Sequence, residues 1–186
     1  MIQKFKVFAF VLLLASFSFA DNLFWTSLNS QIGLGAVQGL KLQSTQFENP
    51  SPTLLVGFSS PYWQNEALQV TIEAQGRFTR LVPTHSNFKL YWAEARGGWG
   101  FHFNHLNHFG FGADLALDII KAPSAPAEYQ FSSAETDYGT VLWLQSPQIH
   151  FGKTQLSARA DWHTALTLPK TSQFISVFLM CEFGVF

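Results

Sequence analysis

Apolar and polar residues alternate without interruption between Phe109 and Ile119. The odd-numbered positions hold Phe, Ala, Leu and Ile, whereas the even-numbered positions hold Gly, Ala and Asp. Because successive side chains of a β-strand point to opposite faces, this segment is predicted to be a strand with one apolar face. On the other face Asp114 and Asp118 lie among small residues, a pattern more typical of a narrow polar interior than of a surface in bulk water.

Alternating or apolar segments of strand length recur along the whole chain. The eight predicted strands cover residues 32–42, 53–58, 68–78, 93–103, 109–119, 138–150, 156–164 and 174–186. Pro147 requires a bulge or a strand end within the sixth segment, because proline cannot donate to a β-ladder. An even number of strands places both ends of the chain on the same side of a closed barrel.

The composition indicates a membrane protein without membrane-spanning helices. Charged residues make up 12% of the chain, whereas an ordinary soluble domain has about 25%. After residue 20 no apolar run reaches the roughly 20 residues that a spanning helix needs. A closed barrel pairs every backbone group between strands and is therefore the alternative way to cross a bilayer. We predict an all-β fold, an eight-stranded antiparallel up-and-down transmembrane β-barrel.

The first 20 residues are predicted to be a cleaved signal peptide. Lys4 and Lys6 precede the apolar run 7–14, and Ser18-Phe19-Ala20 has the small residues of a cleavage site. Residues 21–186 then form a single barrel domain. The one cysteine, Cys181, cannot form an internal disulfide.

With its signal sequence, eight segments and C-terminal Phe186, the chain resembles the small eight-stranded outer-membrane barrels of Gram-negative bacteria. The resemblance implies a location in the bacterial outer membrane, contact with outer-membrane lipid, and recognition of Phe186 by the barrel-assembly machinery. Residues 121–137 become an external loop with a surface partner that the sequence does not identify. The apolar face of the last segment is odd-numbered, so Phe186 either follows a bulge near Glu182 or faces inward.

Charged residues of four predicted strands share the face opposite the apolar one. They are Glu73, Arg77, Glu94, Arg96, Asp114, Asp118, Arg159 and Asp161. The interior of an eight-stranded barrel is just wide enough for side chains to fill. Buried charges are costly unless they are paired. We predict a salt-bridged polar lumen; a narrow ion path is the alternative.

Three histidines are predicted to meet at one rim of the barrel. His102, His108 and His150 lie at strand ends on the same side. Neutral imidazoles brought together can bind zinc or copper. The other interpretation is a chance grouping of amphipathic rings at a membrane interface, where Tyr62, Trp63, Tyr91, Trp92 and Tyr138 are also expected. No other cofactor is implied.

The function predicted from these features is structural or surface-interacting, within the outer membrane. One alternative is an exported soluble barrel, lipocalin-like, which would bind an apolar ligand and need its apolar face inward. A second is a lipid-modifying enzyme that uses an Asp161–His163 dyad; Ser157 lies roughly 20 Å away along the strand, so another strand must supply the nucleophile. With 11 basic and 12 acidic residues, the chain has no basic stripe for nucleic acid.

Overall fold

The computed structural model describes residues 28–41, 50–81, 90–121, 135–165 and 173–184. These residues form nine antiparallel strands and one short 3₁₀ helix, η1 (Asn104–Leu106). The strands are β1 (Asn29–Lys41), β2 (Ser51–Gln64), β3 (Leu68–Leu81), β4 (Leu90–Phe103), β5 (Phe109–Lys121), β6 (Glu135–Gln145), β7 (Ile149–Phe151), β8 (Thr154–Ala165) and β9 (Gln173–Gly184). No helix in the described part of the chain is long and apolar enough to cross a bilayer.

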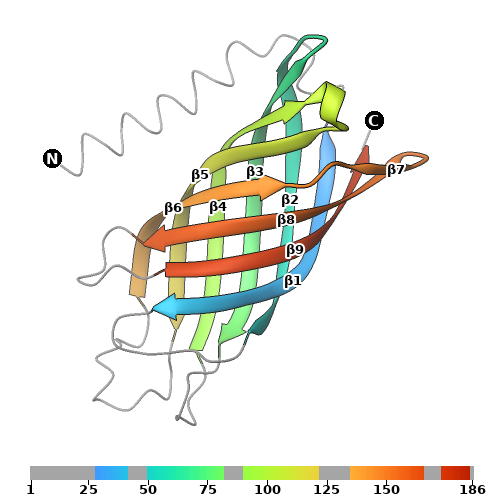
Figure 1. The fold of residues 1–186 in the computed structure, drawn as a ribbon. Coiled ribbons are helices and arrows are strands. Elements are labelled where there is room, and N and C mark those ends of the chain that lie inside the picture. Colours follow the sequence, from blue (N-terminus) through green and yellow to red (C-terminus); the bar gives the residue numbers. More distant parts are fainter. Residues whose placement is uncertain (1–27, 42–49, 82–89, 122–134, 166–172, 185–186) are drawn as a thin grey trace, which may run out of the picture.

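Eight of these strands close into an up-and-down barrel (Figure 1). Each strand from β1 to β5 pairs with the next one along the chain, β8 pairs with β9, and β9 pairs with β1. The ladder between β6 and β8, from Gly139–Ala165 to Gln145–Arg159, completes the ring. β7 pairs with β8 alone and forms a short hairpin outside the ring. The predicted all-β, eight-stranded antiparallel barrel is confirmed, with one extra short strand.

Burial alternates along the strands, and the charged face lies inside. In β5, Asp114 and Asp118 are buried, whereas Phe111, Leu115 and Ile119 are exposed on the outer surface. Burial also alternates along the other long strands, and their buried faces contain most of the polar side chains together with some large apolar ones. The lipocalin-like alternative requires the opposite arrangement, with the apolar face inside the barrel.

The two ends of the barrel differ in how strands are joined. At one end, which we call the turn end, the short connections 65–67, 104–108 and 152–153 join strands. Asn65 Oδ1 closes the first of them by accepting hydrogen bonds from the backbone N–H groups of Ala67 (2.8 Å) and Leu68 (2.7 Å). Asn107 and His108 have left-handed backbone angles, with φ of 50° and 59°. At the opposite end, the loop end, β1, β3, β5 and β8 finish.

Several strand boundaries differ from the sequence prediction. The second strand is not a short run over 53–58, because it extends through Ser59, Ser60 and Pro61 to Gln64. The connection predicted as long, 59–67, is consequently a turn of residues 65–67. The sixth predicted strand, 138–150, ends at Gln145, and β7 begins after Pro147.

The last strand has the register that places its cleaner apolar face outward. Val177, Leu179 and Phe183 are exposed, whereas Glu182 is buried in the lumen. The β1–β9 ladder shifts register between Gly39 and Lys41 but runs evenly past Glu182. The predicted signal peptide 1–20, most of the predicted loop 121–137 and the predicted assembly signal Phe186 lie outside the described residues.

Apolar side chains occupy part of the interior. Leu81, Leu90, Trp92, Ile120 and Phe174 are buried near the loop end. A second interior cluster joins residues of β2 and β9, and it consists of Leu55, Phe178 and Met180. Trp92, predicted at a membrane interface, is instead 1% exposed inside the barrel. The polar residues are therefore concentrated between the loop-end apolar layer and the turn end.

The closing ladder can be tested by disulfide trapping. Leu142 and Trp162 are paired across β6 and β8 on the outer surface. Directly paired residues lie about 4.5–5.5 Å apart between Cα atoms, within the range of a disulfide. With Cys181 replaced by Ser, Leu142→Cys with Trp162→Cys should oxidise to an intramolecular disulfide that is visible by gel mobility.

The matched control for this test pairs Leu142→Cys with Ile175→Cys in the same background. Ile175 lies one strand further on, opposite Trp162 in β9. It is therefore too distant from residue 142 for a disulfide. Equal cross-linking of both pairs, or of neither, would contradict the closed ring.

Candidate functional site: the charged lumen

Arg159 of β8 lies at the centre of the polar interior and binds three carboxylates. Its Nη1 donates to Glu73 Oε2 (2.7 Å), its Nε to Asp161 Oδ1 (2.9 Å) and its Nη2 to Asp114 Oδ2 (3.2 Å). The guanidinium also stacks on Trp143, with Cζ 4.1 Å from the ring centroid. One cation therefore connects β8 to β3, β5 and β6 across the lumen.

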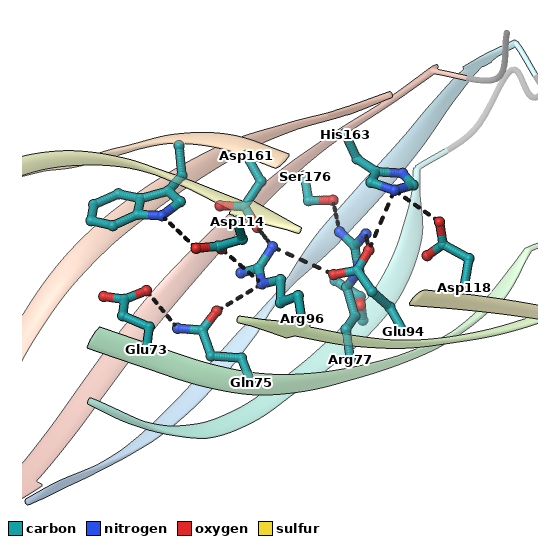
Figure 2. A network of polar contacts seen from close by, with 12 residues as sticks. Glu73, Gln75, Arg77, Glu94, Arg96, Asp114, Asp118, Asp161, His163 and Ser176 are labelled. Carbon is teal, nitrogen blue, oxygen red and sulfur yellow. Dashed lines mark hydrogen bonds and ion pairs between the residues drawn. The ribbon is translucent and has the colours of Figure 1, made fainter. Parts of the chain in front are cut away.

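Arg96 of β4 forms the second centre of this network (Figure 2). Its Nη1 donates to Asp161 Oδ2 at 2.6 Å and its Nε to Gln75 Oε1 at 2.8 Å. Gln75 in turn donates to Gln31 and Glu73, at 2.6 and 3.2 Å. Because Asp161 bridges Arg96 and Arg159, the two cations share one carboxylate.

The third cation, Arg77 of β3, lies closer to the loop end. It forms an ion pair with Glu94 of β4 and donates to Ser176 Oγ of β9 at 2.6 Å. Its guanidinium lies over Trp92, with Cζ 3.9 Å from the ring centroid. A tryptophan thus covers Arg77 as Trp143 covers Arg159, an arrangement that adds cation–π attraction to the ion pairs.

His163 of β8 joins the carboxylates at the loop-end side of this network. Its Nε2 is 2.9 Å from Asp118 Oδ2 and 4.0 Å from Glu94 Oε2. Figure 2 shows the imidazole directed at both carboxylates. Asp161, which the enzyme alternative pairs with His163, instead accepts hydrogen bonds from Arg96 and Arg159 through its two oxygens. The carboxylate next to His163 comes instead from β5.

Inward glycines make room for the large side chains of the lumen. A Cβ at Gly139 would collide with His163 Nε2, and one at Gly100 would lie 2.9 Å from the Trp143 ring. A Cβ at Gly112 would also overlap Trp143. These glycines therefore permit the close packing that brings charged groups of different strands together.

All eight charged residues predicted to line the lumen are buried there, and they belong to one connected group of polar side chains. His163 was not predicted to belong to this group, and neither were Gln31, Gln75, Trp92, Trp143 and Ser176. It also did not place Glu182, whose Oε1 accepts from Gln145 Nε2 at 3.2 Å. The inward-facing positions of Gln75 and Trp143 in their strands could have indicated that they belong to the lumen. Their partners could not be predicted, because these lie on strands far apart in sequence.

The turn end of the lumen contains a small polar cavity. Its volume is about 90 Å³, and its lining includes Thr71, Glu73, His102, His108, Gln155 and Glu182. At about 30 Å³ for each molecule in the liquid, this is space for on the order of three waters. His102 reaches Thr71 Oγ1 with its Nε2, at 3.2 Å. The cavity is therefore a polar pocket with room for a few water molecules at one end of the lumen.

The three histidines predicted to bind metal do not converge. His102 and His108 line the cavity, whereas His150 is exposed and its ring centroid is 6.2 Å from that of His108. Burial and the neighbouring His150 lower the pKa of His108. In the described part of the chain one group of three metal-type donors lies within 4.8 Å, and it is Glu94, Asp118 and His163. The rim prediction gains no support from this arrangement.

Comparison with known proteins assigns no activity to this lumen. No family model matches the chain, and no curated protein is similar to it in sequence. The lumen itself is a densely paired interior in which His163 is directed at carboxylates.

Removing Arg159 tests whether the charged network stabilises the barrel. Arg159→Met leaves Glu73, Asp114 and Asp161 without their shared cation, and breaking a buried pair costs about 3–5 kcal/mol. The free energy of unfolding, measured by urea titration of the folded barrel, should fall by that amount. Arg159→Lys should lose less, because it keeps the charge.

The control for Arg159 is the exposed Arg80 on the outer surface of β3. Arg80→Ala should change the free energy of unfolding by no more than about 0.5 kcal/mol. Equal stability of Arg159→Met and Arg80→Ala would show that the lumen pairs do not hold the barrel together.

The lowered pKa of His108 predicts acid sensitivity at the turn end. The unfolded chain takes up a proton near the ordinary pKa of about 6.5, whereas the folded state resists it. The stability that the folded protein gains from a neutral His108 is therefore present above that pH and is lost as the pH falls through it. His108→Asn, which tolerates the left-handed backbone, should lose less stability than wild type between about pH 7.5 and pH 5.5. Parallel urea titrations of both proteins measure this; an identical loss would exclude the effect.

Proposed function

We propose that this protein is an integral β-barrel of a bacterial outer membrane, with a closed, salt-bridged lumen and a structural or surface-interaction role. The observation that carries the proposal is the polarity of the wall. Between the two ends of the barrel its charged side chains lie inside, and the side chains exposed on its outer surface are predominantly apolar, which suits a surrounding of acyl chains.

The outer surface is apolar on every long strand. Exposed large apolar residues include Leu34, Val56, Phe78, Phe101, Leu115, Leu142, Trp162 and Leu179. The exposed charged side chains of the described residues are Glu66, Arg80, Lys121 and Lys153, all close to one end of the barrel or the other. A belt of this kind is far larger than the apolar patches of soluble monomers. Each side chain placed in lipid instead contributes favourable transfer free energy.

Aromatic residues at both ends of the barrel also support a position across a bilayer. Tyr62 and Trp63 are exposed near the turn end, and Tyr138 is exposed near the loop end. Tyr62 packs edge-on against Trp99, with ring centroids 5.1 Å apart. Tyrosine and tryptophan are enriched at membrane–water interfaces, so these positions fit the two edges of a bilayer.

The remaining parts of the proposal rest on the sequence. Residues 1–20 direct export, Phe186 is read by the barrel-assembly machinery, and residues 121–137 are external. With residues 121–137 outside the cell, the turn end faces the periplasm. A surface partner would bind at the loop end, because that end receives the long connection.

A charge in the apolar belt distinguishes a membrane barrel from a soluble one. Leu115 lies midway along β5 and is 54% exposed. In a bilayer Leu115→Arg should cost about 2–4 kcal/mol, whereas in a soluble barrel an exposed Leu→Arg change should be nearly neutral. The measurements are urea unfolding in lipid vesicles and the amount of assembled barrel in the outer-membrane fraction.

The matched control is Phe151→Arg in the β7–β8 hairpin. Phe151 is similarly exposed, at 60%, but lies at the turn end. There an arginine should cost about 0–1 kcal/mol. Wild-type protein should require detergent for extraction; its release by osmotic shock, or equal effects of both substitutions, would overturn the proposal.

A further inference from the structure

Three metal-type side chains from different strands converge next to the loop-end apolar layer. They are Glu94 of β4, Asp118 of β5 and His163 of β8, and one donor atom of each lies within 4.8 Å of the others. All three side chains are at most 1% exposed. Two carboxylates and an imidazole are thus held together where bulk water does not reach them.

Several of the polar atoms at this point lack hydrogen-bond partners. His163 Nε2 and Asp118 Oδ2 are 2.9 Å apart, yet neither atom makes a hydrogen bond of acceptable geometry, and His163 Nδ1 has no partner either. Buried polar groups in folded proteins are almost always satisfied by protein, water or a bound ion. A buried imidazole aimed at two carboxylates without bonding them well calls for a further group between them.

Neighbouring residues fix the orientation of each donor. Trp92 Nε1 donates to Asp118 Oδ1 at 2.8 Å, so that Oδ2 remains directed at His163. Arg77 holds Glu94, and a carboxylate can keep that partner while it binds an ion. The His163 ring packs against Trp92 and Phe174, with centroids 5.3 and 5.6 Å away. Such outer contacts orient the ligands in protein metal sites.

The charge of the interior also favours a cation. Among the described residues, seven buried carboxylates face three buried arginines. The carboxylates are Glu73, Glu94, Asp114, Asp118, Asp137, Asp161 and Glu182. Buried negative charge is expensive, and a divalent ion at the acidic group nearest His163 reduces its cost.

We propose that Glu94, Asp118 and His163 form a binding site for a divalent transition metal of the zinc class. One imidazole nitrogen with two carboxylate oxygens suits zinc, and water can complete a four-coordinate shell. This site is distinct from the histidine rim at the turn end. It also goes beyond the proposed membrane role, which does not depend on a metal.

The test is to refold the full barrel in detergent with zinc or with a chelator, remove excess metal and measure bound zinc by elemental mass spectrometry. Wild type should retain one zinc per barrel and unfold at a higher temperature with zinc than with chelator. Asp118→Asn and His163→Gln should weaken binding at least 100-fold. The matched control His102→Gln, a buried histidine at the turn end, should bind as wild type does.

Folded wild type that retains no zinc, or binding unchanged in Asp118→Asn and His163→Gln, would overturn the proposal. Binding lost in His102→Gln alone would place the metal at the rim and also overturn it. If the lumen variants do not fold, the visible absorption spectrum of wild-type protein loaded with cobalt(II) tests the proposal instead. Visible d–d absorption that zinc abolishes supports the site, and its absence refutes it. None of these outcomes changes how the protein fractionates, so the membrane proposal is tested separately.

Discussion

The pairing of buried charges across the lumen is the constraint on which the barrel depends. Arg159 binds carboxylates of β3 and β5 from β8, and Arg77 of β3 reaches Ser176 of β9. These contacts join strands that are not neighbours in the wall, so they hold opposite sides of the barrel in place relative to one another. A slip of one residue in any of these strands would turn its charges to the outer surface and its apolar side chains inward. The network therefore selects the register as well as stabilising it.

The sequence was sufficient to identify the charged face, because the two-residue period of a strand assigns sides without knowledge of the partners. That is why Glu73 and Arg77, far in sequence from Arg159 and Asp161, could be grouped on one interior surface. Which carboxylate meets which cation depends on how strands are staggered around the ring. Asp161 is two residues from His163 on the same face, yet it binds Arg96 and Arg159, and Asp118 from β5 takes its place.

Strands with apolar residues on both faces resisted prediction for a different physical reason. In β9, Phe178 and Met180 face the lumen while Val177 and Leu179 face outward, so the contrast between the two sides is weak. The inward position of Phe178 is possible because Gly35 of the paired strand has no side chain; a Cβ there would lie 2.9 Å from the Phe178 ring. β2 was predicted too short because Ser59, Ser60 and Pro61 resemble a turn, although they continue the strand.

The early end of β6 has a mechanical consequence for the wall. Because β6 finishes before Pro147, its ladder with β8 is the shortest of the ring, and the first residues of β8 pair with the small β7 hairpin instead. Most of the other ladders extend over nearly the full length of their strands. They include the ladder between β1 and β9, the first and last strands of the barrel. Local opening is easiest where the fewest backbone bonds must break. The β6–β8 ladder is therefore the part of the wall that opens most easily. Trp143 of β6 and Arg159 of β8 lie beside it, and their contacts in the lumen stabilise the closed barrel.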